Sequence, residues 1–465
     1  MIEASVRFDC SDPSLLALIR AAEEKCLKNI KRFGDKEVLI EGGGYEKVWI
    51  ETQPMGGAMY GKRNIEVALN NVKIFMDHQR EDGRLPGSIE NKQGVIVPQF
   101  DKFQGFCFAE PALDVYYLIG KDKAYLQQLY EVLIKYDEYL WAVRDSDGDG
   151  CLESWCVYDT GEDNAVRYGD APNYWDKDVA PDEFTLVPIA SMDFMSYSYS
   201  ARKVVSEIAR LLGDEDSALL YDKRAKEVRD KLRDYLWDER NGAFFDRDKK
   251  HQTMTALLHN NLRTMYWGSM DPEQAKRFVY DHLTNPDEFW TKLPLPSVAA
   301  NDPVFRNERV NNWSGQCQGL TYQRAIRALE NYGYYKLIPK LGNKLFEAIG
   351  SEHAFVQQYD PFTMEPCMES VAGLQDGYGP TLLSSLEYFA RMYGVSLIRD
   401  KLVWGCSRGA DVTYEQTYGD SSFVLENSGD KARGLINGKE IFVAQRGCRI
   451  ETDLKGKVIA KNEGF

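Results

Sequence analysis

Several features that mark other classes of protein are scarce or absent in this 465-residue sequence. It holds five histidines and nine scattered cysteines, with no HExxH or CxxC motif, which argues against a zinc site. No GxGxxG or GxxxxGK[ST] motif follows a predicted strand and no GxSxG is present, so we expect neither nucleotide binding nor a nucleophile elbow. The net charge is −15 without a basic stripe, which argues against a nucleic-acid partner.

A long hydrophobic run is also missing. The first residues, MIEASVRFDCSDPSLLALI, have no charged-then-apolar leader, and LLALI is too short to span a bilayer or to act as a signal core. We interpret the odd, scattered set of cysteines as reduced thiols. The sequence therefore predicts a cytoplasmic protein without a membrane partner. No heptad repeat indicates an oligomeric state, which stays open.

Helical periodicity is what the sequence has in abundance, from about residue 14 to residue 393. Apolar residues recur at steps of three and four in about a dozen segments, with Asp214 as one predicted start and Gly350 as one predicted end. Long loops separate them, and their recurrence after helix pairs favours a barrel of helical hairpins with its loops on one face. These loops cover residues 41–58, 81–108, 144–182, 284–317 and 351–380.

The pattern changes near residue 396, where apolar and polar residues begin to alternate. Asn437-Gly438 between two such stretches is typical of a tight β-hairpin turn. We therefore expect two domains, a helical barrel over residues 1–393 and a small antiparallel β-domain over residues 394–465 that supports it.

The stretch DTGEDNAVRY, residues 159–168, packs carboxylates, a glycine, an amide and an arginine into ten positions. A glycosidase needs one carboxyl to protonate the leaving oxygen and a second group to activate water or attack directly. Aromatic residues make up 12% of the chain, more than a plain core requires, and their flat faces stack on sugar rings. Taken alone, the stretch is more typical of a solvated acidic loop.

Its surroundings favour the catalytic interpretation. RDSDGDGCLESWCVYDTGEDNAVRY, residues 144–168, resembles the D-x-D-G-D/N-G-L…E-S-G-x-D-N-S-P-R stretch of the processing α-glucosidase I, mannosylglycerate hydrolase and trehalase group. The resemblance implies an inverting glycosidase on an (α/α)6 toroid, with Asp163 as general acid beside Asn164 and Arg167. Asp159-Thr160 stands where the group has Glu-Ser, and Ala165-Val166 where it has Ser-Pro.

Five further stretches resemble the group in the same order along residues 41–393. They imply substrate contacts from residues on several loops. The stretches are YEKVWIETQPMGG with Trp49, Glu51 and Gln53, HQREDGRLPGSI, NNWSGQCQGLTYQRAIRALENYGY with Trp313 and Gln316, FVQQYDPFT with Tyr359, and LQDGYGPT with Tyr378.

One departure concerns the general base. The group has E-x-Y-D-P where this chain has Gln357, and an amide cannot take a proton from water at neutral pH. Three interpretations stay open. The chain is an engineered inactive variant, or the base is a neighbour such as Glu365, Glu369 or Asp376, or the protein binds sugars or runs different chemistry. Glu369 is the preferred substitute.

DSDGDG, with Asp145, Asp147 and Asp149, looks like the start of a calcium loop. The bidentate Glu expected at its twelfth position is replaced by Cys156. Calcium is thus an open alternative to a tight turn, and we expect no cofactor and no other metal.

These observations predict a mainly α protein, an (α/α)6 toroid with a small C-terminal antiparallel β-domain. We expect it to hydrolyse a short α-linked oligosaccharide or glycoside by an inverting acid/base mechanism, so that its partner is a small carbohydrate. The alternatives are a catalytically impaired or engineered carbohydrate-binding form, and a sugar epimerase or phosphorylase on the same toroid. An epimerase would need an acid/base pair, for which only His78 and His353 lie near polar loops.

Overall fold

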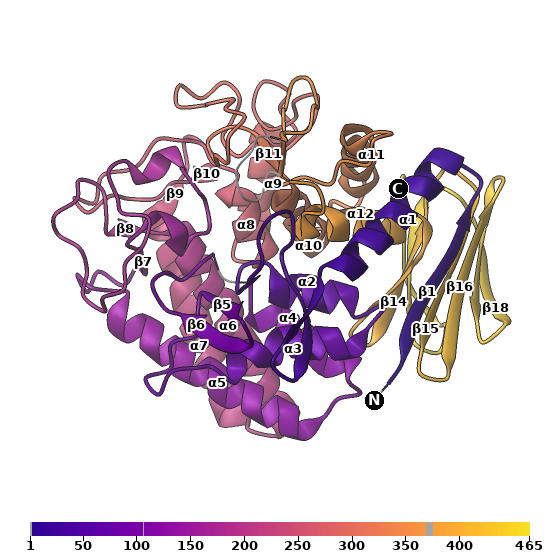
Figure 1. The fold of residues 1–465 in the computed structure, drawn as a ribbon, viewed down its shortest axis with the longest axis horizontal. Coiled ribbons are helices and arrows are strands. Elements are labelled where there is room, and N and C mark those ends of the chain that lie inside the picture. The colour runs from indigo at the N-terminus through magenta and orange to yellow at the C-terminus, as the bar shows by residue number, and fades with distance from the viewer. Residues whose placement is uncertain (1, 106, 369–374) are drawn as a thin grey trace.

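Helices of two concentric rings build the barrel in the computed structural model, which describes residues 2–105, 107–368 and 375–465. The inner helices contact one another in a closed circle, so the fold is the predicted (α/α)6 toroid (Figure 1). The inner ring is α2 (Gln53–Tyr60), α4 (Ala109–Leu118), α6 (Met192–Leu212), α8 (Asn260–Tyr266), α10 (Gly319–Asn331) and α12 (Gly379–Tyr393). The outer ring is α1 (Pro13–Lys28), α3 (Ile65–Met76), α5 (Lys123–Val143), α7 (Glu215–Lys231), α9 (Pro272–Phe278) and α11 (Leu337–Ile349).

The two rings bury their residues differently. All residues of α12 are buried, whereas outer helix α7 buries only one stripe, Ala218, Tyr221, Ala225 and Val228, at helical spacing. The predicted helix ends are confirmed: the Asp214 side chain accepts a hydrogen bond from the Ser217 backbone amide, and Gly350 ends α11 with a positive φ.

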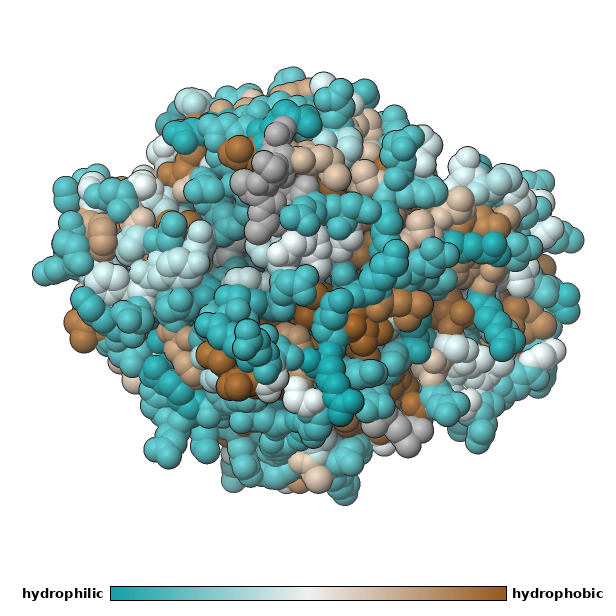
Figure 2. Space-filling view, in the orientation of Figure 1, coloured by the Kyte–Doolittle hydropathy of each residue, from teal (hydrophilic) through white to brown (hydrophobic). Residues whose placement is uncertain are grey.

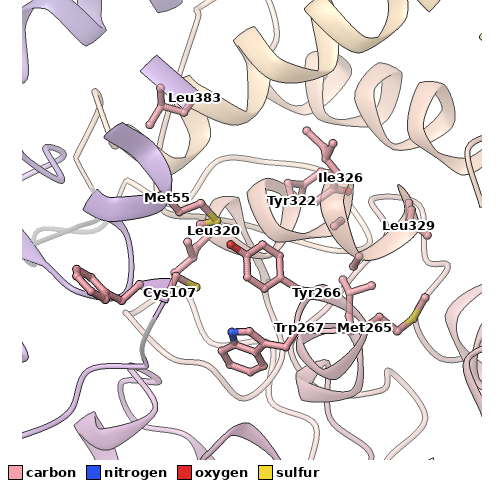
Figure 3. Close-up of a cluster of buried hydrophobic side chains, with 14 of the residues drawn as sticks. Met55, Cys107, Met265, Tyr266, Trp267, Leu320, Tyr322, Ile326, Leu329 and Leu383 are labelled. Atoms are coloured by element: carbon pink, nitrogen blue, oxygen red, sulfur yellow. The ribbon is translucent and has the colours of Figure 1, made fainter. Parts of the chain in front are cut away.

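Apolar side chains from the inner helices meet in the middle of the barrel. Figure 3 shows part of this buried cluster, with Met55 from α2, Tyr266 from α8, Leu320 and Ile326 from α10 and Leu383 from α12. These side chains are buried. Their burial removes apolar surface from water and holds these four inner helices together.

Two antiparallel sheets pack beside the barrel. The five-stranded sheet runs in the order β1 (Ala4–Cys10), β15 (Val412–Tyr418), β16 (Ser421–Ser428), β17 (Lys431–Ile436), β18 (Lys439–Gln445). The four-stranded sheet runs in the order β13 (Val395–Ile398), β14 (Lys401–Cys406), β19 (Cys448–Asp453), β20 (Val458–Glu463).

The N-terminal strand belongs to the first of these sheets. Strand β1 pairs with β15 from Ala4 opposite Tyr418 to Cys10 opposite Val412, and Figure 1 shows it in indigo among the yellow strands. The sequence assigns residues 4–10 to the barrel domain, because the expected domain boundary lies at residue 393, whereas in the structure they form a strand of this sheet. The division of the chain into two domains stays a prediction. The predicted hairpin turn is confirmed, since Asn437 and Gly438 both have positive φ between β17 and β18.

Long segments precede the inner helices and gather at the N-terminal end of the ring. They carry short paired strands that fix their course. These strands are β2 (Ile30–Phe33), β3 (Lys36–Leu39), β4 (Val48–Trp49), β5 (Ser88–Lys92), β6 (Val95–Gln99), β7 (Glu153–Ser154), β8 (Ile189–Ala190), β9 (Trp237–Asp238), β10 (Ala243–Phe244), β11 (Cys317–Gln318) and β12 (Gln358–Tyr359).

Figure 2 shows mostly hydrophilic residues on the face in view, with hydrophobic residues in small groups between them. Within the described ranges, no helix has the length and apolar character needed to cross a bilayer.

A network of buried ion pairs closes the opposite end of the barrel and joins it to the sheets. The Glu387 carboxylate on α12 accepts hydrogen bonds from Lys62 at 2.6 Å and from Arg391 at 3.0 Å. Arg391 also bonds Glu330 on α10, which lies 3.5 Å from Arg449 on strand β19. Charges buried here depend on their partners, because the unpaired ions would be poorly solvated.

We expect Glu387→Gln to lower the free energy of unfolding by about 3–5 kcal/mol, because it leaves the buried Lys62 and Arg391 cations without their shared anion. Glu440→Gln is the matched control, since the Glu440–Arg433 pair is half exposed and should contribute less than about 1 kcal/mol. Urea denaturation of both variants checks this. Equal losses would contradict the structural role given to the buried network.

Candidate active site

A cavity opens among the loops at the N-terminal ends of the inner helices. The cavity is small, with a volume of about 120 Å³. Six predicted residues line it: Trp49, Glu51, Asp163, Trp313, Gln357 and Tyr378. Six others line it that the sequence did not single out: Glu41, Tyr45, Gln104, Tyr158, Gly161 and Tyr174.

Asp163 is held by the loop that precedes α10. Its backbone carbonyl accepts a hydrogen bond from the Trp313 amide at 3.0 Å, and its carboxylate accepts one from the Asn311 side-chain amide at 2.5 Å. Burial raises the pKa of Asp163 to about 6, against the opposing effects of the Asn311 hydrogen bond and the Lys102 charge. A carboxyl with this pKa keeps its proton in mildly acidic solution, where an ordinary aspartate has already lost it.

A chain of hydrogen bonds connects Asp163 with Gln357 across the cavity. The Asn311 amide donates both to Asp163 and, at 2.9 Å, to the Tyr45 hydroxyl. The Tyr45 hydroxyl in turn donates to the Gln357 side-chain oxygen at 3.2 Å. The acid and the position of the expected base therefore lie on two walls joined by Asn311 and Tyr45.

A buried ion network anchors the Asp163 loop from below. The Arg167 guanidinium pairs with Glu162, with Asp193 at 2.8 Å and with Asp246 at 2.5 Å. Glu162 also lies 2.9 Å from a ring nitrogen of His259. Glu162 and Arg167 stand on either side of Asp163 in the sequence, so these ion pairs fix the loop, and none of the paired groups lines the cavity.

Glu51 packs against the same loop. Its carboxylate accepts a hydrogen bond from Arg324 at 3.0 Å and lies 3.7 Å from Arg263. Burial raises its pKa to about 7, although both arginines act in the opposite direction. A Cβ atom on Gly161 would lie 2.0 Å from a Glu51 oxygen, so only glycine lets the loop approach this closely.

Glu41 is the functional candidate that sequence reasoning missed. Its carboxylate accepts a hydrogen bond from the Tyr378 hydroxyl at 3.1 Å, and the Gly379 amide donates to its backbone carbonyl. Burial, together with the nearby Glu51 and Asp163 carboxylates, raises the pKa of Glu41 well above its usual value. The signal lay in EGGGY at residues 41–45, where glycines of positive φ fold the backbone against Tyr378.

Aromatic rings form the walls. Tyr45 contacts Trp49 at 6.2 Å and Tyr378 at 6.4 Å between ring centroids, and Trp313 packs on His259 at 5.5 Å. The indole nitrogens of Trp49 and Trp313 are buried donors without a hydrogen-bond partner among the described residues. Such donors are costly to bury unless something satisfies them.

The other predicted site residues that the structure describes do not line the cavity, and a direct contact with substrate stays a prediction for each. Most are buried and hydrogen-bonded within the protein: Gln53 to the Trp49 amide, Arg167 to the three carboxylates, Gln316 to Gln358 and Tyr359 to the Ala354 carbonyl. Asn164 is exposed and donates to the Asn311 carbonyl at 2.6 Å.

None of the residues predicted to replace the general base is found among the described residues that line the cavity. Glu369 lies outside the described residues. Glu365 is exposed near Arg309, and Asp376 pairs with Lys25 at 2.6 Å; neither lines the cavity.

The candidate calcium loop brings together a different set of ligands from the one expected. Oxygen or nitrogen atoms of Asp147, Asp149 and His251 lie within 4.8 Å of one another, whereas Asp145 is not part of this group. The Asp145 carboxylate instead accepts a hydrogen bond from the Gly150 amide, as in a tight turn.

We expect Gly161→Ala to be much more destabilising than Gly148→Ala. Both glycines have φ near +70°, but the added Cβ meets Glu51 at position 161 and open space at position 148. The control should lose about 1 kcal/mol from backbone conformation alone, and Gly161→Ala should lose several. Denaturant titration of both variants measures the difference. Similar losses would show that the Asp163 loop does not depend on its packing against Glu51.

Several proteins of known structure are similar to this chain in fold. The mannosylglycerate hydrolase of Thermus thermophilus has a TM-score of 0.64 and 16% identity over 80% of this chain and 100% of its own. The neutral trehalase of Saccharomyces cerevisiae has a TM-score of 0.58 and 15% identity over 79% of each chain. A structure titled "Sialidase" has a TM-score of 0.74 and 14% identity over 97% of this chain but only 42% of its own.

Sequence comparison gives a relative and a family. An uncharacterized protein of Borreliella burgdorferi is 23% identical over 268 residues, and the match spans 56% of this chain and about half, 51%, of the relative. The family model of the mannosylglycerate hydrolase MGH1-like glycoside hydrolase domain matches residues 55–378, which hold Asp163, Trp313 and Gln357. The chain therefore belongs to the MGH1-like glycoside hydrolase family.

Proposed function

We propose that this protein hydrolyses a short α-linked glycoside, with Asp163 as the general acid. The observation that carries the proposal is that the Asp163 carboxyl, whose pKa is raised, lies in an aromatic-walled cavity. The cavity belongs to a toroid of the MGH1-like glycoside hydrolase family. The names of two similar structures, mannosylglycerate hydrolase and trehalase, support a small glycoside as substrate.

In this mechanism the Asp163 proton passes to the glycosidic oxygen as the bond to the anomeric carbon breaks. Burial keeps the proton on Asp163 until the leaving oxygen gains charge, and the Asn311 amide then stabilises the carboxylate that remains. Water attacks the opposite face of the anomeric carbon in an inverting enzyme, whose two carboxyls stand roughly 6.5–9.5 Å apart.

The cavity wall supports recognition of a sugar. The Trp49 and Trp313 rings offer flat apolar faces, and their unsatisfied indole nitrogens, with the unsatisfied side-chain oxygen of Gln104, suit a ligand rich in hydroxyl groups. Hydroxyls would supply the hydrogen bonds that these buried atoms lack within the described protein.

A carbohydrate-binding form without hydrolysis is the second candidate. It is favoured by Gln357, which lines the cavity as an amide at the position of the expected base and accepts a hydrogen bond from Tyr45. An epimerase is less well supported, because the described lining contains no histidine and His78 bonds the Ile74 carbonyl. A cytoplasmic location stays a prediction from the cysteines, all nine of which are buried.

The proposal predicts that Asp163→Asn lowers kcat/KM by about 10²–10⁴-fold, because the variant cannot protonate the leaving group. A panel of aryl α-glycosides and disaccharides, including mannosylglycerate and trehalose, provides the assay. The loss of kcat/KM should be greatest for substrates with poor leaving groups. In the parent, kcat/KM should fall as pH rises through about 6, since Asp163 then loses its proton.

Asp176→Asn is the control, an identical change at an exposed position of the same long segment, and should leave activity unchanged. A parent that binds sugars but cleaves none of the panel would favour the binding form. Full activity in Asp163→Asn would remove Asp163 from the mechanism.

A further inference from the structure

Two carboxyl groups besides that of Asp163 line the cavity, and neither stands at the expected position of the general base. Gln357 cannot take a proton from water, so the hydrolysis proposed above needs another acceptor. Among the described residues that line the cavity, the carboxyl groups are those of Glu41, Glu51 and Asp163. Asp163 is assigned to the leaving group, which leaves Glu41 and Glu51.

Glu51 is held by other interactions. Its oxygens face Arg324, Arg263 and the Gln104 amide, and the Gly161 backbone packs directly against one of them. Arg324 and Arg263 face one Glu51 oxygen, and the Gln104 amide and the Gly161 backbone face the other, so neither oxygen is free to take a proton from water. Glu51 therefore holds the Asp163 loop in place, and we do not assign it to the activation of water.

Glu41 is placed differently. Among the described residues, Tyr378 is the one hydrogen-bond donor to the Glu41 carboxylate, and it reaches one of the two oxygens at 3.1 Å. The Tyr378 backbone amide bonds the Phe355 carbonyl, two residues before Gln357, and the Tyr378 ring contacts Tyr45. Glu41 therefore lies on the Gln357 wall, separated from Asp163 by Tyr45 and Asn311.

We propose that Glu41 is the general base of this enzyme and replaces the carboxylate that Gln357 cannot supply. The inference rests on the proposed function. One water proton passes to Glu41 while the water oxygen bonds the anomeric carbon. The glycosidic bond breaks in the same step and its oxygen takes the Asp163 proton. Glu41 then returns its proton to solvent and Asp163 regains one.

The arrangement has a consequence for pH dependence. Glu51, Asp163, Tyr45 and Tyr378 face Glu41, and burial with the two carboxylates raises the pKa of Glu41 well above its usual value. The productive form has Glu41 ionised and the proton on Asp163, so kcat/KM should rise with pH through the Glu41 pKa and fall through that of Asp163. Because the two carboxyls interact, the limbs report values of the pair.

Glu41→Gln tests the proposal, and Glu46→Gln is its control, the same change at an exposed position of the same loop. We expect Glu41→Gln to lower kcat/KM by about 10²-fold or more on aryl glycosides and on glycosyl fluorides alike. Asp163→Asn should retain activity on glycosyl fluorides, because fluoride leaves without a proton. Activity of Glu41→Gln within a few-fold of the parent would overturn the proposal.

Two further measurements separate a base from a residue that only supports the fold. Azide should restore turnover in Glu41→Ala and form a glycosyl azide, since it attacks without giving up a proton; no rescue would overturn the proposal. Tyr378→Phe removes the hydroxyl that lowers the pKa of Glu41. It leaves Glu41 in place and should move the acid limb of kcat/KM to higher pH, and an unmoved limb would count against the assignment.

Gln357→Glu distinguishes failure of this inference from failure of the proposed function. Combined with Glu41→Gln, it should raise activity at least tenfold over Glu41→Gln alone, because it supplies a base on the same wall. If the parent is inactive on the whole panel and Gln357→Glu is active, Glu41 is not the base but the hydrolase frame stands. If both are inactive, the proposed function itself is wrong.

Discussion

Confinement of carboxyl groups in one cavity is the constraint on which the rest of this site depends. Glu41, Glu51 and Asp163 share a small, aromatic-walled space, and the arginines of that region neutralise only Glu51. Ionising all three would place like charges together in a poorly solvated site, so the cavity retains protons where surface carboxyls would lose them. This property is a cost for stability and a benefit for acid/base chemistry.

The toroid makes this confinement possible. Six inner helices place their preceding loops at one end, and residues from five of these loops reach the cavity. Glycines of positive φ at positions 43 and 161 bring the backbone close to Tyr378 and Glu51, and the ion pairs of Arg167 hold the Asp163 loop. The opposite end carries the ion pairs that join the barrel to the sheets. The proposed active site and these stabilising contacts therefore lie at different ends of the barrel.

Much of the architecture could be predicted from the sequence, because helical periodicity, the Asp214 cap and the Asn437-Gly438 turn are local signals. The pairing of β1 with β15 could not, since contact between residues 400 positions apart leaves no local pattern. At the site, motif order located Asp163, Trp313 and Gln357. Glu41 and Tyr45 escaped because their meaning arises only when the loop folds against Tyr378 and Gln357. Gln316 and Tyr359 fit the motifs but have their hydrogen bonds inside the wall.

The central claim is that the fold holds a proton on Asp163 in this cavity. Carbon-13 NMR titration of labelled aspartate carboxyls, with the Asp163 signal assigned by its loss in Asp163→Asn, measures this directly. The account predicts a midpoint near 6, because burial outweighs the Asn311 hydrogen bond and the Lys102 charge. A midpoint at the ordinary aspartate value of about 3.9 would contradict it.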